Sequence, residues 1–209
     1  MTDIYFFEIK ENFNPLSLPF FEKTFSKERL KKPALLPEKK YLASLLGEAI
    51  VKNVTAKKFN TSAKNIIIEK TKTGKPYLKD FPDFYFNVSH SENAAAIAVS
   101  DKEIGIDIEF LRKPNLKVAE RFFTKDEQEY IRTNPNQNTA FFEIWTKKES
   151  YYKYIGTGLN ASIKKLSVFD SALNAHIETF IKNNVVFSVC TQAKENIDFK
   201  VINANDKKI

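Results

Sequence analysis

The stretch IGIDIEF, residues 104–110, alternates large apolar residues with Gly105, Asp107 and Glu109. This alternation predicts a β-strand, because successive side chains of a strand point to opposite faces. One face would carry the three isoleucines and Phe110, and the other face would carry the two acids. The Cα atoms of the acids would lie about 6.7 Å apart, and at an effective dielectric constant of about 20 their charges would repel by roughly 3 kcal/mol. The stretch therefore predicts either a solvated acidic face or a site for a divalent cation.

Length and composition limit the classes of protein. A chain of 209 residues with 43% hydrophobic content can bury a full core, as one domain or two small ones. We expect no membrane span or signal peptide, since no segment approaches the ~20 apolar residues that a spanning helix needs. The single Cys190 permits no internal disulfide, which favours a reducing compartment, and we expect a cytoplasmic protein. The net charge of +7 favours a polyanionic partner: nucleic acid, an acidic protein or a phosphorylated ligand.

Hydrophobic periodicity predicts a mixed α+β fold. Long helices are expected over 38–54 and 139–155, the second ended by Gly156 as a left-handed cap. Thr124 and Glu127 have the spacing of a capping box, so a helix should begin after Thr124. Further helical material is expected over 116–132. Strands are expected over 4–9, 65–70, 84–88, 94–100, 104–110, 165–169, 176–182, 185–191 and 197–203, with a hairpin turn at Asn183-Asn184.

The helix expected over 139–155 places a charge among apolar residues. On a helical wheel Lys148 lies in the middle of an apolar arc, whereas Lys147 and Ser150 face away. An uncompensated buried ammonium costs several kcal/mol, so Lys148 needs an anionic partner or a route to water along its own stem. The residues of the arc are Phe141, Ile144, Trp145, Tyr151, Tyr152 and Ile155.

Glu149 lies at the edge of the same arc and could complete a three-carboxylate site with Asp107 and Glu109. Such a site suits Mg²⁺, which takes few protein oxygens and fills its octahedron with waters and substrate phosphates. In this interpretation Lys148 supplies a positive charge to phosphate oxygens or to the departing group.

Two upstream segments could contact phosphate. The segment TGKPYL, residues 73–78, holds Lys75 between Gly74 and Pro76, which predicts either an anion-binding loop or an ordinary turn. The segment NVSHS, residues 87–91, ends a predicted strand with Ser89, His90 and Ser91, all of which can donate hydrogen bonds to phosphate. A surface histidine without a ligand is the alternative interpretation of His90.

Read in order, these segments resemble the Sfp-type 4′-phosphopantetheinyl transferases. The resemblance covers about residues 73–160. It implies two similar α+β lobes, 1–102 and 103–209, with the active site in the cleft between them. The matching motifs are Gly74-Lys75-Pro76, Asn87-Val-Ser89-His90-Ser91, Gly105-Ile-Asp107-Ile-Glu109, Arg121-Phe-Phe-Thr-Lys-Asp-Glu127, Trp145-Thr-Lys-Lys148-Glu149-Ser150, and the run from Lys153 to Gly156-Thr-Gly158-Leu159.

The resemblance also implies the reaction. A transferase of this family moves the phosphopantetheine arm of coenzyme A to a serine of an apo acyl or peptidyl carrier protein and releases 3′,5′-ADP, with Mg²⁺. The first lobe would contact the coenzyme A nucleotide, and the second would hold the metal and dock the carrier. We expect a monomer, because two lobes in one chain already frame a cleft. Residues 111–123, a mixture of apolar and basic residues, are the candidate docking surface, with ordinary helix packing as the alternative.

Residue roles follow from the same resemblance. The implied metal ligands are Asp107, Glu109 and Glu149. The implied phosphate contacts are Lys75, Ser89, His90, Lys148 and Lys153, with Pro76 beside the adenine. Glu149, or a water on the metal beside it, would be the base for the carrier serine, so Glu149 and Lys148 are the expected catalytic residues.

One position departs from the family pattern. Family members often carry a basic residue just before the LLG turn of the first long helix, where it meets the 3′-phosphate of coenzyme A. This chain has Ala43 there. Lys27, Lys31, Lys39 or Lys40 could substitute.

Two other classes of protein would explain part of the pattern. A Mg²⁺-dependent nuclease would account for the charge and the two acids, but it leaves the Gly-Lys-Pro and Ser-His-Ser segments without a role. A non-catalytic nucleic-acid-binding module would need basic residues interleaved with exposed aromatics, whereas the aromatics here lie in segments that read as core. The sequence therefore favours the transferase, and we expect no nucleic-acid partner.

Overall fold

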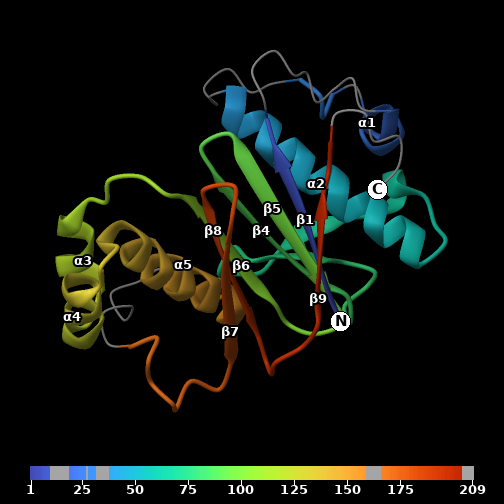
Figure 1. Ribbon diagram of the computed structural model, residues 1–209. Helices are drawn as coiled ribbons and strands as arrows, with labels where there is room; N and C mark the ends of the chain where they lie inside the picture. Colours follow the sequence, from blue (N-terminus) through green and yellow to red (C-terminus); the bar gives the residue numbers. More distant parts are fainter. Residues whose placement is uncertain (10–18, 27, 32–37, 159–165, 204–209) are drawn as a thin grey trace.

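The computed structural model describes residues 1–9, 19–26, 28–31, 38–158 and 166–203 (Figure 1). Within these ranges no helix is both long enough and apolar enough to cross a membrane. The elements are β1 (Thr2–Glu8), α1 (Pro19–Thr24), α2 (Glu38–Lys58), a 3₁₀ turn η2 (Ala63–Asn65), β2 (Ile68–Lys70), β3 (Pro76–Leu78), β4 (Tyr85–Ser91), β5 (Ala94–Ser100), β6 (Gly105–Phe110), α3 (Leu116–Phe122), α4 (Lys125–Thr133), α5 (Gln137–Ile155), β7 (His176–Lys182), β8 (Val185–Thr191) and β9 (Ile197–Val201). The fold is mixed α+β, as predicted.

The described strands form two main sheets and one small hairpin. The first sheet has the order β4-β5-β1-β9, the second has the order β6-β8-β7, and β2 pairs with β3. All neighbours are antiparallel except β1 and β9, which run parallel. Since β9 comes from the end of the chain, the second half of the sequence contributes one strand to the sheet of the first half.

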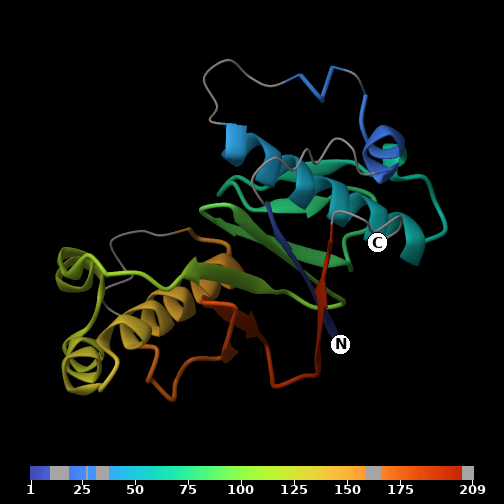
Figure 2. The same ribbon diagram turned by 45° about the horizontal axis from the view of Figure 1, so that its top comes forward.

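Helices and sheets stack in four layers. Helix α2 covers one face of the first sheet, the second sheet packs on the other face, and α5 covers the far side of the second sheet (Figures 1 and 2). Strand β5 shows how its sequence produces this arrangement. Ala95, Ile97 and Val99 belong to the core under α2, whereas the alternate alanines at 94, 96 and 98 belong to the core between the sheets.

Strand β6 has the two faces that its alternation predicts. Ile104, Ile106 and Ile108 are buried between the two sheets. Its opposite face meets α5, and Gly105 makes this contact possible: a Cβ atom there would lie 2.0 Å from the carbonyl oxygen of Ser150. The glycine therefore lets α5 lie directly on β6, over the two acids.

Several predicted elements are confirmed. Helix α5 ends at Gly156, which has φ +73°. The backbone N–H of Thr124 donates to Glu127 (2.8 Å), as a capping box requires. The turn between β7 and β8 has positive φ at both of its asparagines, residues 183 and 184.

Three local predictions are wrong. Ser150 is fully buried, not outward-facing, because the glycine of β6 draws α5 close. The segment predicted as a strand over 65–70 is a strand only over its last three residues. The predicted strand at 165–169 is absent from its described part, 166–169: there the N–H of Val168 donates to a side chain of α4, and the carbonyl oxygen of Leu166 accepts from a side chain of α5.

Candidate active site

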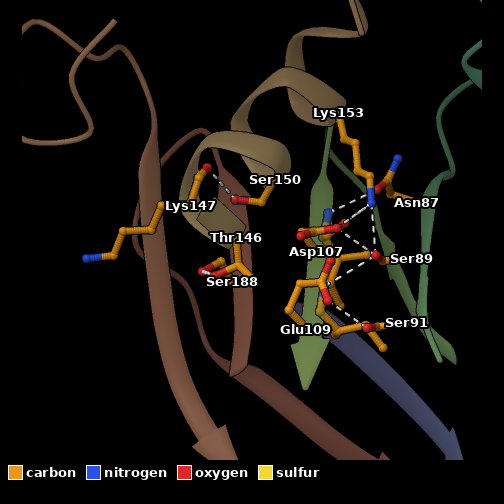
Figure 3. A network of polar contacts seen from close by, with 12 residues as sticks. Asn87, Ser89, Ser91, Asp107, Glu109, Thr146, Lys147, Ser150, Lys153 and Ser188 are labelled. Carbon is orange, nitrogen blue, oxygen red and sulfur yellow. Dashed lines mark hydrogen bonds and ion pairs between the residues drawn. The ribbon is translucent and has the colours of Figure 1, made fainter. Parts of the chain in front are cut away.

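Alternate side chains of β4 connect the two sheets. Asn87 accepts a hydrogen bond from the backbone N–H of Ile106 (3.0 Å), and the hydroxyl of Ser89 accepts one from the N–H of Ile108 (3.3 Å). Strand β6 pairs with β8 along one edge and has no described strand along the other. Asn87 and Ser89 therefore satisfy backbone N–H groups on the unpaired edge of β6 (Figure 3). The contacts fix the position of β6 and of its acidic face.

Serine hydroxyls of β4 also donate hydrogen bonds to both predicted acids of β6. The hydroxyl of Ser89 donates to Asp107 Oδ1, and the hydroxyl of Ser91 donates to Glu109 Oε2, each at 2.7 Å. Both pairs are 18 residues apart in sequence, so β4 and β6 run in the same direction here. The two-residue period of the Asn-x-Ser-x-Ser motif therefore matches that of Gly-x-Asp-x-Glu.

Lys153 of α5 reaches the same point from above (Figure 3). Its ammonium lies 2.7 Å from Asp107 Oδ1, 2.9 Å from the hydroxyl of Ser89 and 3.1 Å from the carbonyl oxygen of Ile106. The three contacts join α5, β4 and β6 in one polar network. A cation is thus held beside the predicted metal ligands, where phosphate oxygens would need it.

Asp107 is a buried acid with spare coordinating capacity. The residue is 5% exposed, and its second oxygen, Oδ2, is buried without a hydrogen-bond partner. Burial raises the pKa of Asp107, and the nearby charge of Lys153 opposes this rise. An unsatisfied carboxylate oxygen is costly to bury, and a bound cation would satisfy it.

Glu109 lies two residues further along the same face. Besides Ser91, its carboxylate accepts from Arg112 at 2.9 Å. Its side chain is 19% exposed, so this acid lies nearer to solvent than Asp107. The arginine connects the acidic face to the start of the predicted docking surface.

Glu149 couples electrostatically to both acids. Its pKa is raised to about 7, first because the side chain is half-buried and next because Asp107 lies close, with a smaller rise from Glu109 and an opposing effect of Lys153. The structure therefore brings Glu149 of α5 near the acidic face of β6. Near neutral pH its proton is easily gained or lost.

These observations fit a divalent cation, although no group of three His, Cys, Asp or Glu side chains in the described ranges already forms a metal-ligating cluster. The fit depends on the unpartnered oxygen of Asp107 and on the raised pKa of Glu149, both of which a cation would relieve. The donors are all carboxylate oxygens, which hard cations such as Mg²⁺ prefer.

Lys148 was predicted to contact phosphate, but in the structure it binds an acid of α4. Its ammonium lies 2.9 Å from Glu127 of α4, and both side chains are fully buried. It also donates to the carbonyl oxygen of Leu166. Of the two alternatives that the sequence left open for Lys148, an anionic partner and a route to water, the structure shows the first, and the partner is Glu127 of the α4 capping box. Glu127 also accepts from the N–H of Val168, so these contacts tie α4, α5 and the segment after residue 165 together. A phosphate contact of Lys148 stays a prediction.

Lys75 and Pro76 line a cavity of about 230 Å³ that extends to Lys153. We call it the central cavity; its described lining is Thr73, Gly74, Lys75, Pro76, Asn87, Val88, Tyr152, Lys153, Gly156 and Gly158. The ammonium of Lys75 donates to the carbonyl oxygen of Tyr154 (2.8 Å) and pairs with Glu103. Two lysines from opposite halves of the sequence therefore face one cavity beside Asp107.

Ser89 and His90 point to opposite faces of β4, since they are neighbours in one strand. Ser89 faces β6, whereas His90 is exposed and lines a second cavity under α2. The predicted pair of phosphate contacts is therefore divided between two subsites.

Ala43 is 2% exposed and cannot contact a ligand phosphate. Of the lysines expected to replace a basic residue there, Lys31 is exposed, whereas Lys27 and the side chains of Lys39 and Lys40 lie outside the described residues. A phosphate contact of Lys31 stays a prediction.

Sequence reasoning missed several partners. Ser91 was expected to contact phosphate and Glu127 to cap a helix, and Glu103 received no role, although each binds a predicted site residue. Only Ser91 had a usable signal, the shared two-residue period of the two strands. The other two are joined to their lysines across 28 and 21 residues, which no local pattern indicates.

Comparison with known proteins agrees with this geometry. One family model, "4′-phosphopantetheinyl transferase, N-terminal", matches residues 22–102, and another, "4′-phosphopantetheinyl transferase superfamily", matches residues 103–204. The two models account for most of the chain. The chain belongs to the 4′-phosphopantetheinyl transferase superfamily.

Curated members of this superfamily are similar to the chain. The 4′-phosphopantetheinyl transferase gsp of Aneurinibacillus migulanus is 40% identical over 118 residues, which is 56% of this chain and 49% of that protein. The transferase Sfp of Bacillus subtilis (strain 168) is 34% identical over 127 residues, 60% of this chain and 57% of that protein. The L-aminoadipate-semialdehyde dehydrogenase-phosphopantetheinyl transferase of Mus musculus is 32% identical over 185 residues, 81% of this chain and 59% of that protein. The chain thus spans about half to three fifths of the length of these curated relatives.

Proposed function

We propose that this protein transfers the 4′-phosphopantetheine group from coenzyme A to a serine of an apo acyl or peptidyl carrier protein. The observation that carries the proposal is the network at Asp107, where a buried carboxylate with one unpartnered oxygen meets Lys153 beside the central cavity. A diphosphate needs this combination of a cation site and fixed positive charge. The named activity of the similar proteins points to the same reaction.

The reaction exchanges one P–O bond for another. The oxygen of the carrier serine bonds to the phosphorus that carries pantetheine, and the bond from that phosphorus to the bridging oxygen breaks. The products are the phosphopantetheinyl serine and 3′,5′-ADP, which leaves with the bonding electron pair. The serine proton goes to a base, for which Glu149, whose carboxylate couples to the acidic face of β6, is the candidate.

Asp107, Glu109 and Glu149 would hold Mg²⁺, which when bound neutralises charge on the diphosphate oxygens. Lys153 is held beside Asp107 by three hydrogen bonds and would exchange one of them for a phosphate oxygen. Lys75 faces the same cavity, and its ammonium could leave the ion pair with Glu103 to contact a phosphate.

The carrier would dock on residues 111–123. Arg112, Lys113 and Arg121 are exposed there, and Leu116 is 54% exposed between them. Phe123, included in the predicted surface, is instead fully buried in the core under α5. Basic groups around an exposed apolar residue, next to Glu109 through Arg112, would suit an acidic carrier.

We further propose that the chain is built from two similar lobes. In sequence, each unit is a strand, a long helix and a hairpin: β1, α2, β4 and β5, then β6, α5, β7 and β8. Within each unit, the strand that comes last in the sequence lies between the other two. The order is β1-β5-β4 in the first unit and β6-β8-β7 in the second. With lobes of this kind framing the cleft, a monomer in the cytoplasm that binds no nucleic acid is the expected form.

The test is to incubate the purified protein with coenzyme A, Mg²⁺ and an apo carrier domain and to weigh the carrier by mass spectrometry. We expect a gain of one phosphopantetheine per carrier. Asp107→Ala should reduce the rate by roughly a hundredfold or more, and Asp83→Ala, which removes an exposed acid before β4, should not. An unmodified carrier with the wild-type protein would refute the proposed function.

A further inference from the structure

Arg112 connects the acidic face of β6 to the surface on which we place the carrier. It follows the last residue of β6 by two positions and belongs to the surface of residues 111–123. Its Nη1 atom donates to Glu109 Oε2 (2.9 Å) and to the carbonyl oxygen of Phe110 (3.1 Å). One side chain therefore belongs both to the surroundings of an implied metal ligand and to the implied docking surface.

Two further groups hold the guanidinium of Arg112 in place. Glu92, in the turn between β4 and β5, has a carboxylate oxygen 3.6 Å from the same Nη1 atom. The φ of Glu92 is +50°, a conformation that glycine adopts readily and glutamate rarely. The guanidinium also lies over the ring of the buried Phe142, with its carbon 5.0 Å from the ring centroid. Groups from β6, from the β4–β5 turn and from α5 thus fix this arginine.

One edge of the guanidinium stays open to a partner. In the described ranges the polar contacts of Arg112 all use Nη1. The other edge, formed by Nε and Nη2, has the geometry that binds a carboxylate through two parallel hydrogen bonds. The side chain is 47% exposed, and Lys113 and Leu116 are exposed on the same surface. A carboxylate of a docked protein can therefore reach Arg112 while Nη1 keeps its place beside Glu109.

The charge of Arg112 opposes a cation at Glu109. A guanidinium on Oε2 neutralises part of the carboxylate charge and repels a second positive charge close by. The hydroxyl of Ser91, which donates to the same oxygen, is neutral and adds no such repulsion. A carboxylate bound on the open edge of Arg112 would neutralise the guanidinium and remove the repulsion. The sign of the effect follows: an acidic group on this surface should strengthen metal binding.

We propose that Arg112 couples carrier docking to metal binding, so that an acidic carrier on its guanidinium tightens the hold of Glu109 on the cation. By linkage the cation then tightens carrier binding by the same factor. This inference rests on the proposed function, because it takes the metal to bind at Glu109 and the carrier to dock on residues 111–123. Arg112 acts through Glu109 and is a positioning residue.

The test measures Mn²⁺ affinity, which needs no transfer of phosphopantetheine. Mn²⁺ is titrated into the full chain at pH 8 without coenzyme A, and the EPR signal of the free ion gives the dissociation constant. The titration is repeated with a saturating carrier domain whose acceptor serine is replaced by alanine, after subtraction of the ion that the carrier binds by itself. We expect this carrier to tighten Mn²⁺ binding by the wild type roughly threefold to tenfold.

Three variants separate the role of Arg112 from a general effect of charge. Arg112→Gln should bind Mn²⁺ roughly threefold to tenfold more tightly than the wild type without carrier, and the carrier should then add little. Arg112→Lys keeps the charge and should retain both the weaker affinity and the carrier effect. Lys113→Gln removes an exposed neighbouring charge of the same surface, so its Mn²⁺ affinity without carrier should stay near that of the wild type.

The outcomes distinguish this coupling from the proposed function. An Arg112→Gln variant that binds Mn²⁺ no more tightly than the wild type, or that keeps the full carrier effect, would overturn the coupling and leave the transferase activity standing. Conversely, coupling through Arg112 in a protein that modifies no carrier would support the role of this residue while the transferase assignment fails.

Discussion

Glu149 should make the metal-free protein lose stability as the pH rises. Burial and the neighbouring carboxylates raise its pKa from 4.5 to about 7 in the folded state. The fold therefore favours the protonated carboxyl, whereas the unfolded chain loses this proton near its ordinary pKa. Between these two values the folded state binds more protons, so the free energy of unfolding falls with rising pH, and the loss is complete above pH 7.

The size of this loss follows from the pKa values. A rise from 4.5 to about 7 corresponds to a total of roughly 3 kcal/mol. About 2 kcal/mol of this loss in unfolding free energy occurs between pH 5.5 and pH 8. Because solvent screens the half-buried side chain, we expect an observed loss of about 1–2 kcal/mol. Glu149→Gln cannot titrate, so the variant should escape this part of the loss.

The assay is urea unfolding of the wild type and Glu149→Gln at pH 5.5 and pH 8, with a chelator present. We expect the stability of the variant relative to the wild type to increase by about 1–2 kcal/mol from the lower to the higher pH. Mg²⁺ in place of the chelator should stabilise the wild type most at pH 8, where the ligand is ionised, and should do less for the variant. Parallel pH profiles of the two proteins would refute the reasoning.

Three further predictions concern the supports of the site. Gly105→Ala forces a Cβ atom into the backbone of α5 and should destabilise the protein by roughly 1–3 kcal/mol or prevent folding, as urea unfolding would show; wild-type stability would contradict the observed approach of α5 to β6. Lys148→Met leaves Glu127 buried without its cation and should cost about 3–5 kcal/mol in the same assay, and a much smaller loss would show that the pair does not persist in solution. Ser91→Ala removes the hydroxyl that orients Glu109, so the Mg²⁺ concentration for half-maximal transfer should rise roughly tenfold or more while the rate at saturating Mg²⁺ recovers; an unchanged Mg²⁺ dependence would contradict this positioning role.

Local periodicity was sufficient for much of the fold. The alternation of IGIDIEF correctly assigned Ile106 to the core and Asp107 to the opposite face, and a single Gly156 marked the end of α5. These features depend on neighbours within a few residues, so the pattern in the sequence carries them. The helical wheel placed Lys148 among apolar residues and left an anionic partner or a route to water as the alternatives, and the structure shows the first.

Long-range partners could not be predicted in this way. The choice of Glu127 for Lys148 depends on how α4 packs against α5, and the pairing of Lys75 with Glu103 depends on how the two halves of the chain meet. Ser89 and His90 were predicted together as phosphate contacts, and only the packed structure shows that their two faces of β4 belong to different cavities. Burial of Ser150 likewise follows from the close approach of α5 to β6, which no wheel includes.

A crystal structure with coenzyme A and Mn²⁺, an ion with distinctive anomalous scattering, would test the site most directly. Oxygen atoms of Asp107, Glu109 and Glu149 should surround one anomalous peak that also touches the diphosphate, with Lys153 beside it. A diphosphate bound elsewhere, or an ion that leaves Asp107 Oδ2 without a partner, would contradict the account.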